Sequence, residues 1–318
     1  MEGGADASQS RGRHTSASGE GAVPQVIAID IGGTKVRSAL VETGSGVISH
    51  VSERVTGDGA AAIVASVIDA ATALQQQGRP KAIGIASAGV IDPVTGAVTS
   101  AGPTIPGWAG TELGARVATA CNLPTSVAND VHAAGWGELG YGGLRGSRTG
   151  LLVAVGTGVG VAACVEGSVV LGGHGLGGTG ARVEWLASGP GIVRLHNGAT
   201  ARPAHDLREV ARRLADGDAV ARSSVVAGAE ALGRWLAPQV ELLDPEKVII
   251  CGGVTHLGAV WHETLAATVR EAVDSRLADV AIELSGLDDH AQLLGAAWQA
   301  VTRPVKTIAL AASKETQH

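Results

Sequence analysis

The chain has 318 residues, of which 45% are hydrophobic, and its formal net charge is -6. Because single hydrophobic cores stop growing near this length, we expect the chain to form two lobes. The Lys and Arg residues are scattered and form no basic stripe, which argues against a nucleic-acid partner. No stretch reaches the roughly 18 to 20 apolar residues that cross a bilayer, so no membrane partner is expected either.

The cysteines and the first residues indicate the compartment. Cys121, Cys164 and Cys251 lie far apart and form no CxxC or Cys/His cluster, so neither a disulfide framework nor a zinc site is predicted. Residues 1–24 are small and polar and lack the apolar core of a signal peptide, and we expect a disordered tail. These features predict a cytoplasmic protein.

From residue 25 onward, short apolar strands alternate with glycine turns. Runs over 26–30, 35–42 and 47–55 predict an antiparallel meander, and a helix is expected over 58–77. A buried strand over 81–87, a helix over 111–121 and a strand ending at Asn129 follow. A second meander begins near residue 151, with a glycine turn at 156–158 and a hairpin at Glu166 and Gly167. The repeated pattern predicts an α/β fold made of two similar lobes.

A long amphipathic helix is predicted after residue 220. Apolar residues recur there at spacings of three and four, as expected for one buried helix face. They are Val225, Ala229, Leu232, Leu236, Val240 and Leu243. Pro238 predicts a kink, the helix is expected to end at Asp244, and a strand, VIICGGV, follows.

The segment VANDVHAAGWGELG, residues 127–140, places Asn129 and Asp130 between a buried strand and a helix. One interpretation is a helix cap, because Asn and Asp side chains accept hydrogen bonds from the first amides of a helix. The other makes Asp130 a general base that reaches a substrate while its backbone stays anchored. Taken alone, the segment favours the helix cap, and the general base needs support from the rest of the chain.

Several glycine turns are candidate phosphate sites, because glycine lets the backbone approach an anion and present its amides. DIGGTK, residues 30–35, does not fit the Walker A pattern. GHGLGG, residues 173–178, contains a bare GxGxxG but lacks a clear following helix and a well-placed acidic residue. We interpret it as a chance match, and any single turn could also be a simple hairpin.

Seven segments taken together resemble the ROK family of bacterial sugar kinases (repressor, open reading frame, kinase). They are IAIDIGGTKVRSAL, PTIPGWAG, VANDVHAAGWGELG, VGTGVGVA, VEWLASGPGI, VIICGGV and LLGAAWQA, in that order. The resemblance extends over about residues 26–300. It implies a two-lobed actin-like, hexokinase-like ATPase fold of duplicated ribonuclease H-like domains. The lobes are expected at 25–128 and 129–289, with the sugar and nucleotide sites between them, and residues 290–318 as a helix returning to the first lobe and a tail.

The resemblance also implies a role for individual residues. Asn129 and Asp130 match the sugar-binding pair, with Asp130 as the catalytic base, and Asp30 is expected to help hold Mg²⁺ indirectly. The expected contacts of ATP are Asp30, Gly32, Gly33, Thr34 and Lys35 in a first phosphate loop, Gly156, Thr157 and Gly158 in a second, and Gly252 and Gly253 facing adenosine.

One segment departs from the family pattern. Members usually carry an ExGH motif and then a CxCGxxGCxE zinc segment, whereas this chain has GGHGLGGTGARVEWLASGPGI at 172–192. Glu184 still matches a sugar-binding Glu of the family, while His174 is interpreted as a loop residue. No zinc is expected.

The resemblance therefore implies an ATP-dependent, Mg²⁺-requiring kinase for the 6-hydroxyl of a hexose or amino-hexose. The leading specific substrate is kanosamine (3-amino-3-deoxyglucose) in antibiotic biosynthesis, because the composition is typical of a GC-rich actinomycete and a kanosamine 6-kinase is known among relatives. The alternatives are a glucokinase, an N-acetyl-hexosamine kinase, a sugar-binding pseudokinase and a ROK-type regulator without a DNA-binding domain. A homodimer is compatible with the family.

Overall fold

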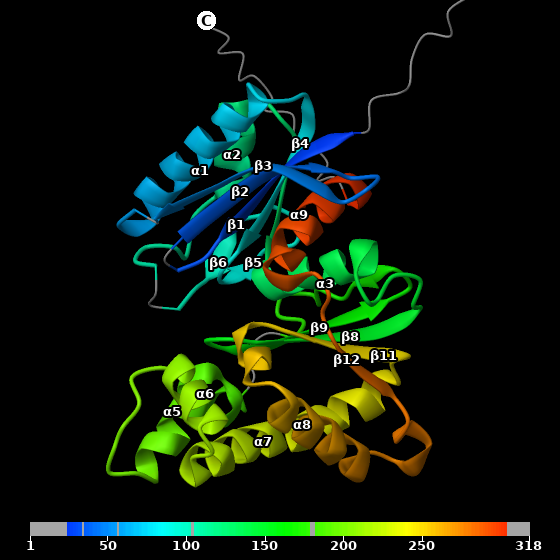
Figure 1. Cartoon of the computed structure of the whole chain (residues 1–318). Coiled ribbons are helices and arrows are strands. Elements are labelled where there is room, and N and C mark those ends of the chain that lie inside the picture. Colours follow the sequence, from blue (N-terminus) through cyan, green and yellow to red (C-terminus); the bar gives the residue numbers. More distant parts are fainter. Residues whose placement is uncertain (1–23, 34, 56, 103–104, 179–181, 304–318) are drawn as a thin grey trace, which may run out of the picture.

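The computed structural model describes residues 24–33, 35–55, 57–102, 105–178 and 182–303. Two five-stranded sheets, with the orders β3-β2-β1-β4-β7 and β10-β9-β8-β11-β12, lie one above the other (Figure 1). In each sheet, three consecutive strands form an antiparallel meander and two later strands run parallel to its first strand. The duplication predicted from the two meanders is therefore present in order and direction.

The strands are β1 (Gln25–Ile31), β2 (Lys35–Glu42), β3 (Val47–Val55), β4 (Pro80–Ser87), β5 (Val90–Ile91), β6 (Val98–Ser100), β7 (Thr125–Asn129), β8 (Thr149–Val155), β9 (Val159–Val165), β10 (Ser168–Val169), β11 (Lys247–Cys251) and β12 (Ala281–Leu284). The α-helices are α1 (Gly59–Gln75), α2 (Leu113–Cys121), α3 (Asp130–Tyr141), α4 (Glu184–Ala187), α5 (Gly189–Gly198), α6 (Leu207–Ala215), α7 (Ala219–Leu243), α8 (Ala259–Ala272) and α9 (Ala291–Thr302). Sequence reasoning did not assign β5, β6, β12, α6 or α8. The three strands are short, whereas α8 carries a regular stripe of Trp261, Leu265 and Val269 that was overlooked.

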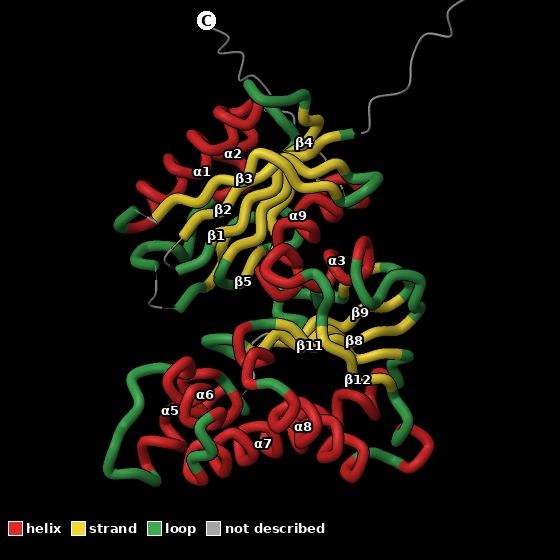
Figure 2. Tube along the Cα trace, in the orientation of Figure 1, coloured by secondary structure: helices red, strands yellow, loops and turns green. Residues whose placement is uncertain are grey.

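Both faces of the first sheet are covered by helices, which explains the nearly continuous apolar runs of β1 and β4 (Figure 2). Alternate residues of β1 belong to two different cores. Ile27 and Ile29 pack with residues of α1 and α2, whereas Val26 and Ala28 pack with α9. Asp30 continues the second series, so its side chain lies on the α9 face of the sheet, toward the other lobe.

Helices α3 and α9 lie between the two sheets and contact each other closely (Figure 1). Glycines make this approach possible. A Cβ atom on Gly295 would lie 1.6 Å from the Ala133 carbonyl oxygen, and one on Gly137 would lie 2.3 Å from that of Ala291. Side chains larger than hydrogen would separate the helices and with them the two lobes.

We keep the lobe boundaries after residues 128 and 289 as proposals.

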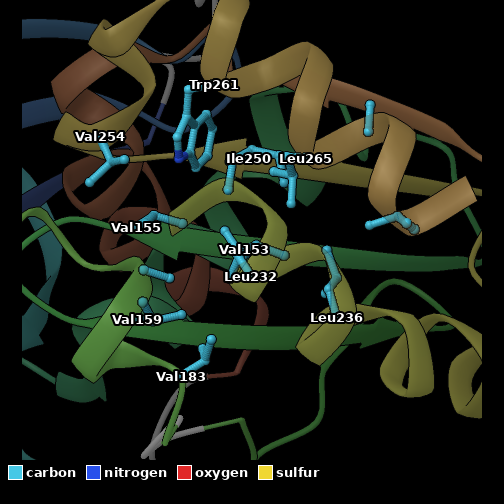
Figure 3. Packing of buried hydrophobic residues seen from close by; sticks show 14 of the residues in the cluster. Val153, Val155, Val159, Val183, Leu232, Leu236, Ile250, Val254, Trp261 and Leu265 are labelled. Atoms are coloured by element: carbon cyan, nitrogen blue, oxygen red, sulfur yellow. The ribbon is translucent and has the colours of Figure 1, made fainter. Parts of the chain in front are cut away.

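The second sheet packs on α7 and α8 through a large apolar core, in which Leu232, Leu236 and Leu265 face the strands (Figure 3). The predicted stripe of α7 is confirmed: its first five apolar residues are buried and Leu243 is partly buried. The helix continues through Pro238 and ends at Asp244, which adopts the left-handed conformation. In the part of the chain that the structure describes, no helix is long and apolar enough to cross a membrane.

Candidate active site

The candidate residues lie where parallel strands end. Asp30 is near the end of β1, and Asn129 ends β7 in the same sheet. The glycine turn 156–158 follows β8, and Gly252 follows β11 in the other sheet. Ligands of open α/β sheets bind outside these carboxyl ends, so the topology gathers residues from four distant parts of the sequence at one place.

Asp30 faces Arg37 across the β1–β2 pair. Burial raises the pKa of the Asp30 carboxyl from 3.8 to about 6, an effect that the Arg37 charge opposes and the negative charge of Asp130 reinforces. Two carboxylates from two distant segments therefore interact electrostatically. Arg37 Nη2 is also 3.3 Å from His290 Nδ1, at the start of α9. Sequence reasoning missed Arg37, whose position five residues after Gly32 in the strand carries no special signal.

Asn129 is the cap of α3. Its Oδ1 accepts hydrogen bonds from the amides of Val131 at 3.0 Å and His132 at 3.4 Å, while its Nδ2 donates to the Gly89 carbonyl oxygen at 2.9 Å. Its side chain also forms a hydrogen bond with Asp130. The polar groups of Asn129 are thus engaged within the protein, and the capping role expected for the Asn-Asp pair belongs to this residue.

Asp130, the first residue of α3, is the other member of the pair. Burial raises the pKa of its carboxyl, and hydrogen bonds from the Val131 amide, at 2.9 Å, and from Asn129 oppose that shift. The same charge affects Asp30 in the first sheet and Cys251 at the end of β11 in the second. Asp130 therefore lies between the lobes, and a raised pKa makes a carboxylate a stronger base.

The first glycine turn is closed by a hydrogen bond from the Gly32 amide to the Lys35 carbonyl oxygen at 2.9 Å. Gly33 is exposed. The Lys35 ammonium forms a 2.6 Å ion pair with Glu53 of β3, and both side chains are about half exposed. An exposed pair of this kind is weak, so Lys35 can exchange Glu53 for another anion. Thr34 lies outside the described residues.

The second glycine turn is held from outside by the α4–α5 region. Gly156 accepts a hydrogen bond from the Gly189 amide at 2.8 Å, and the Val159 amide donates to Glu184 Oε2 at 3.2 Å. A Cβ atom on Gly158 would lie 2.8 Å from the same carboxylate oxygen. Thr157 at the tip of the turn is exposed. The two ends of the turn are thus fixed while its tip faces solvent.

The third turn follows β11 and lies against the end of β8. Gly252 has a φ of 98°, and a Cβ atom there would lie 2.5 Å from the Val155 carbonyl oxygen. Only glycine fits such a conformation without strain. A Cβ atom on Gly253 would meet no atom within 4 Å. The second and third turns are therefore neighbours, as the expected nucleotide site requires.

Glu184 opens α4, a helix of only four residues, and its side chain reaches the second glycine turn. The structure brings it to the same strand ends as the glycine turns. A sugar contact by Glu184 stays a prediction.

Trp108 also positions the site, although its role was not recognised from the PGW segment in which it lies. Its buried indole Nε1 donates to Ser87 Oγ at 3.2 Å and to the Ala88 carbonyl oxygen at 3.1 Å. These residues lead directly to Gly89, which Asn129 holds. A Trp next to Pro-Gly is usually a packing residue, so the PGW segment carried only a general signal.

Within the described ranges, no group of three or more His, Cys, Asp or Glu side chains could hold a metal ion by itself. All three cysteines are buried and unpaired. The expectation that the chain binds no zinc stays a prediction.

The duplicated sheets and the strand-end residues define a two-lobed ATPase of the hexokinase-like type. The model of the ROK family matches residues 26–180 and 177–303, and the chain belongs to the ROK family. A glucokinase from Halalkalibacterium halodurans is 28% identical over 316 residues, which cover 86% of this chain and 93% of that protein.

An N-acetylmannosamine kinase from Shigella flexneri is 31% identical over 251 residues, which cover 72% of this chain and 83% of that protein. The crystal structure of a ROK family glucokinase from Streptomyces griseus in complex with glucose and AMPPNP is similar with a TM-score of 0.74. It is 26% identical, and the match covers 86% of this chain and 98% of that one.

Proposed function

We propose that this ROK-family, ATP-dependent sugar kinase phosphorylates the 6-hydroxyl of a hexose or amino-hexose. The observation that carries the proposal is the Asp130 carboxylate, held between the lobes by Asn129 and with a pKa raised by burial. Asp130 accepts the proton of the 6-hydroxyl while that oxygen bonds to the γ-phosphorus of ATP and the bond to the ADP oxygen breaks.

The glycine turns support the binding of ATP, the phosphoryl donor in this reaction. The turns at 32–33, 156–158 and 252–253 would contact the phosphates and the nucleoside, because glycine backbone can approach an anion closely. The amides of Gly32 and Gly156 already donate within their own turns, so Gly33, Thr157 and Gly158 would supply the donors of the first two turns. The exposed tip at Thr157 and the open space around Gly253 leave room for a nucleotide.

Asp30 fits a role in holding Mg²⁺. This ion prefers oxygen ligands and is usually bound by one or two carboxylates together with waters and substrate phosphates. Burial and the charge of Asp130 raise the pKa of Asp30, and a nearby cation would offset both effects. We propose that Asp30 holds the ion through water, and the bound ion would neutralise charge on the phosphates.

Kanosamine is the leading specific substrate that we propose. The carboxylates of Asp30 and Asp130 lie near each other, with Arg37 as the cation that acts on Asp30, so an ammonium group would be attracted. Asn129 would contribute little to binding this ammonium group, because its Oδ1 already accepts hydrogen bonds from two helix amides. An ammonium at the 3-position would therefore depend on Asp130. Glucose and N-acetylated hexosamines are the alternatives, in line with the names of the relatives.

Coupled ADP release with kanosamine, glucose, glucosamine, N-acetylglucosamine and N-acetylmannosamine tests the proposal. We expect turnover with at least one sugar and the highest kcat/KM with kanosamine. If glucose or an N-acetylated sugar exceeds kanosamine tenfold, a difference of about 1.4 kcal/mol in transition-state binding, the amino-sugar assignment is wrong. Sugar binding without ADP release from any sugar would instead identify a pseudokinase.

A further inference from the structure

The last four residues of GHGLGG, 175–178, are confined between the lobes. Gly175 is buried with a φ of 69°, and a Cβ atom there would lie 2.2 Å from the carbonyl oxygen of Ile91 in β5. Gly178 has a φ of 77°, and its Cβ would lie 1.8 Å from the carbonyl oxygen of Val161 in β9. We call residues 175–178 the glycine segment. Its glycines are required because it passes between backbone of the first lobe and backbone of the second.

A buried histidine holds this segment to α3. His132 lies in the first turn of α3, and its Nε2 contacts the Gly177 carbonyl oxygen. Burial lowers the pKa of His132, so the ring is neutral near pH 7. Because a carbonyl oxygen only accepts hydrogen bonds, Nε2 carries the proton and donates it. The Gly177 amide donates to the Leu171 carbonyl oxygen at 2.9 Å, which fixes the segment from its other side.

The first turn of α3 therefore anchors two segments beside Asp130. Asn129 holds Gly89, one residue before β5, and His132 holds Gly177 of the glycine segment. The two segments meet each other where Gly175 packs under Ile91. Asp130 lies in the chain between the two anchoring side chains, so both segments end up close to the group that would receive the proton of the sugar.

We propose that the glycine segment forms a wall of the sugar site and that His132 is the positioning residue for this wall. The inference rests on the proposed function, since it concerns the acceptor sugar of the same reaction. It gives GHGLGG a role that does not involve phosphate: the segment closes the acceptor site between the lobes, and its backbone groups, with no carboxylate among residues 175–178, face the sugar.

A pair of glycine substitutions tests the wall. Gly175→Ala places a methyl group against the Ile91 carbonyl and strains a positive φ, so the segment cannot keep its place. Gly173→Ala is the matched control, because its Cβ would meet no atom within 4 Å and its φ is not positive. We expect Gly175→Ala to raise the sugar KM about tenfold and change the ATP KM less than twofold, while Gly173→Ala leaves both KM values near wild type.

A pair of histidine substitutions tests the anchor. His132→Ala should raise the sugar KM about tenfold with little change in the ATP KM, and His132→Gln should recover most of it, because the Gln Nε2 can donate the same hydrogen bond. His174→Ala, which removes an exposed histidine just before the segment, is the control. Calorimetric titration with glucose in the absence of ATP should show the same order of affinities.

Sugar KM values within twofold of wild type for both His132→Ala and Gly175→Ala would overturn the inference, as would equal changes in the two KM values. If His132→Ala does not fold, Gly175→Ala decides the question, because it keeps His132 and displaces only the glycine segment. Failure of the proposed function looks different: wild-type protein would then release no ADP with any sugar, whereas failure of this inference leaves the wild type active.

Discussion

The two sheets share one strand order but end their parallel strands in different chemistry. In the first sheet, the ends of β1 and β7 lead to the carboxylates of Asp30 and Asp130. In the second, the ends of β8 and β11 lead to glycine turns that have no charged side chain of their own. The comparison teaches that a duplicated fold can place buried acidic groups at the strand ends of one half and only uncharged glycine turns at those of the other, although β1 also leads to the glycine turn at 32–33.

The largest effect should come from removing the carboxylate that we propose as the base. Asp130→Asn should lower kcat about 10²- to 10⁴-fold, the usual contribution of a general base. The fold should persist, because Asn129 and not Asp130 caps α3. Steady-state ADP release measures the loss, and Asp69→Asn on the exposed side of α1 is the control for a removed charge. Turnover near wild type would show that Asp130, at the end of the first sheet, is not the general base.

The charge on Asp30 should lower stability at neutral pH. Its pKa is raised from 3.8 to about 6, so between these values the folded state binds more protons than the unfolded state, and the free energy of unfolding falls as the pH rises. The shift corresponds to at most about 3 kcal/mol. Asp30→Asn should therefore be more stable than wild type at pH 8 without Mg²⁺, and this gain should disappear below pH 4.

Urea unfolding of the two proteins across this pH range measures the difference. If Asp30→Asn is equally stable or less stable at pH 8, the first sheet does not carry a destabilising charge at its strand end, and the electrostatic contrast between the sheets is smaller than we infer.

The role of the glycine turns in the second sheet is tested at the third turn, Gly252 and Gly253. Gly252→Ala should raise the ATP KM about tenfold and destabilise the protein by about 1 to 3 kcal/mol, because the new Cβ meets the Val155 carbonyl at a positive φ. Gly253→Ala next to it has open space and should fold normally. A normal ATP KM for Gly252→Ala, measured at saturating sugar, would separate this turn from the nucleotide.

Substitution of Glu184 should give the smallest effect. It tests whether Glu184 contacts the sugar or only holds the second glycine turn. Glu184→Gln keeps an oxygen that can accept the Val159 amide, so the second turn should stay in place and only the charge is lost. If Glu184 contacts the sugar, the sugar KM should rise several-fold and the ATP KM should stay nearly constant. A change in the ATP KM alone would assign Glu184 to the glycine turn.

The general organisation could be read from the sequence with good accuracy. Short-range periodicity determines whether a segment forms a strand or a helix, so the meander of β1 to β3 and the buried stripe of α7 were predicted correctly. The roles within the Asn-Asp pair were less clear. Which side chain caps α3 depends on backbone angles at the end of β7, and the sequence favoured a cap without assigning it to Asn129 or Asp130.

The sequence by itself determined the family, the two lobes and the residue types at the strand ends, because these follow from local patterns and ordered motifs. Only the tertiary structure decided which groups meet. The electrostatic coupling of Asp30 with Asp130, the hold of Trp108 on Ser87 and that of His132 on Gly177 all join segments more than 20 residues apart. Such contacts arise from how sheets and helices pack, and no periodicity along the chain encodes them.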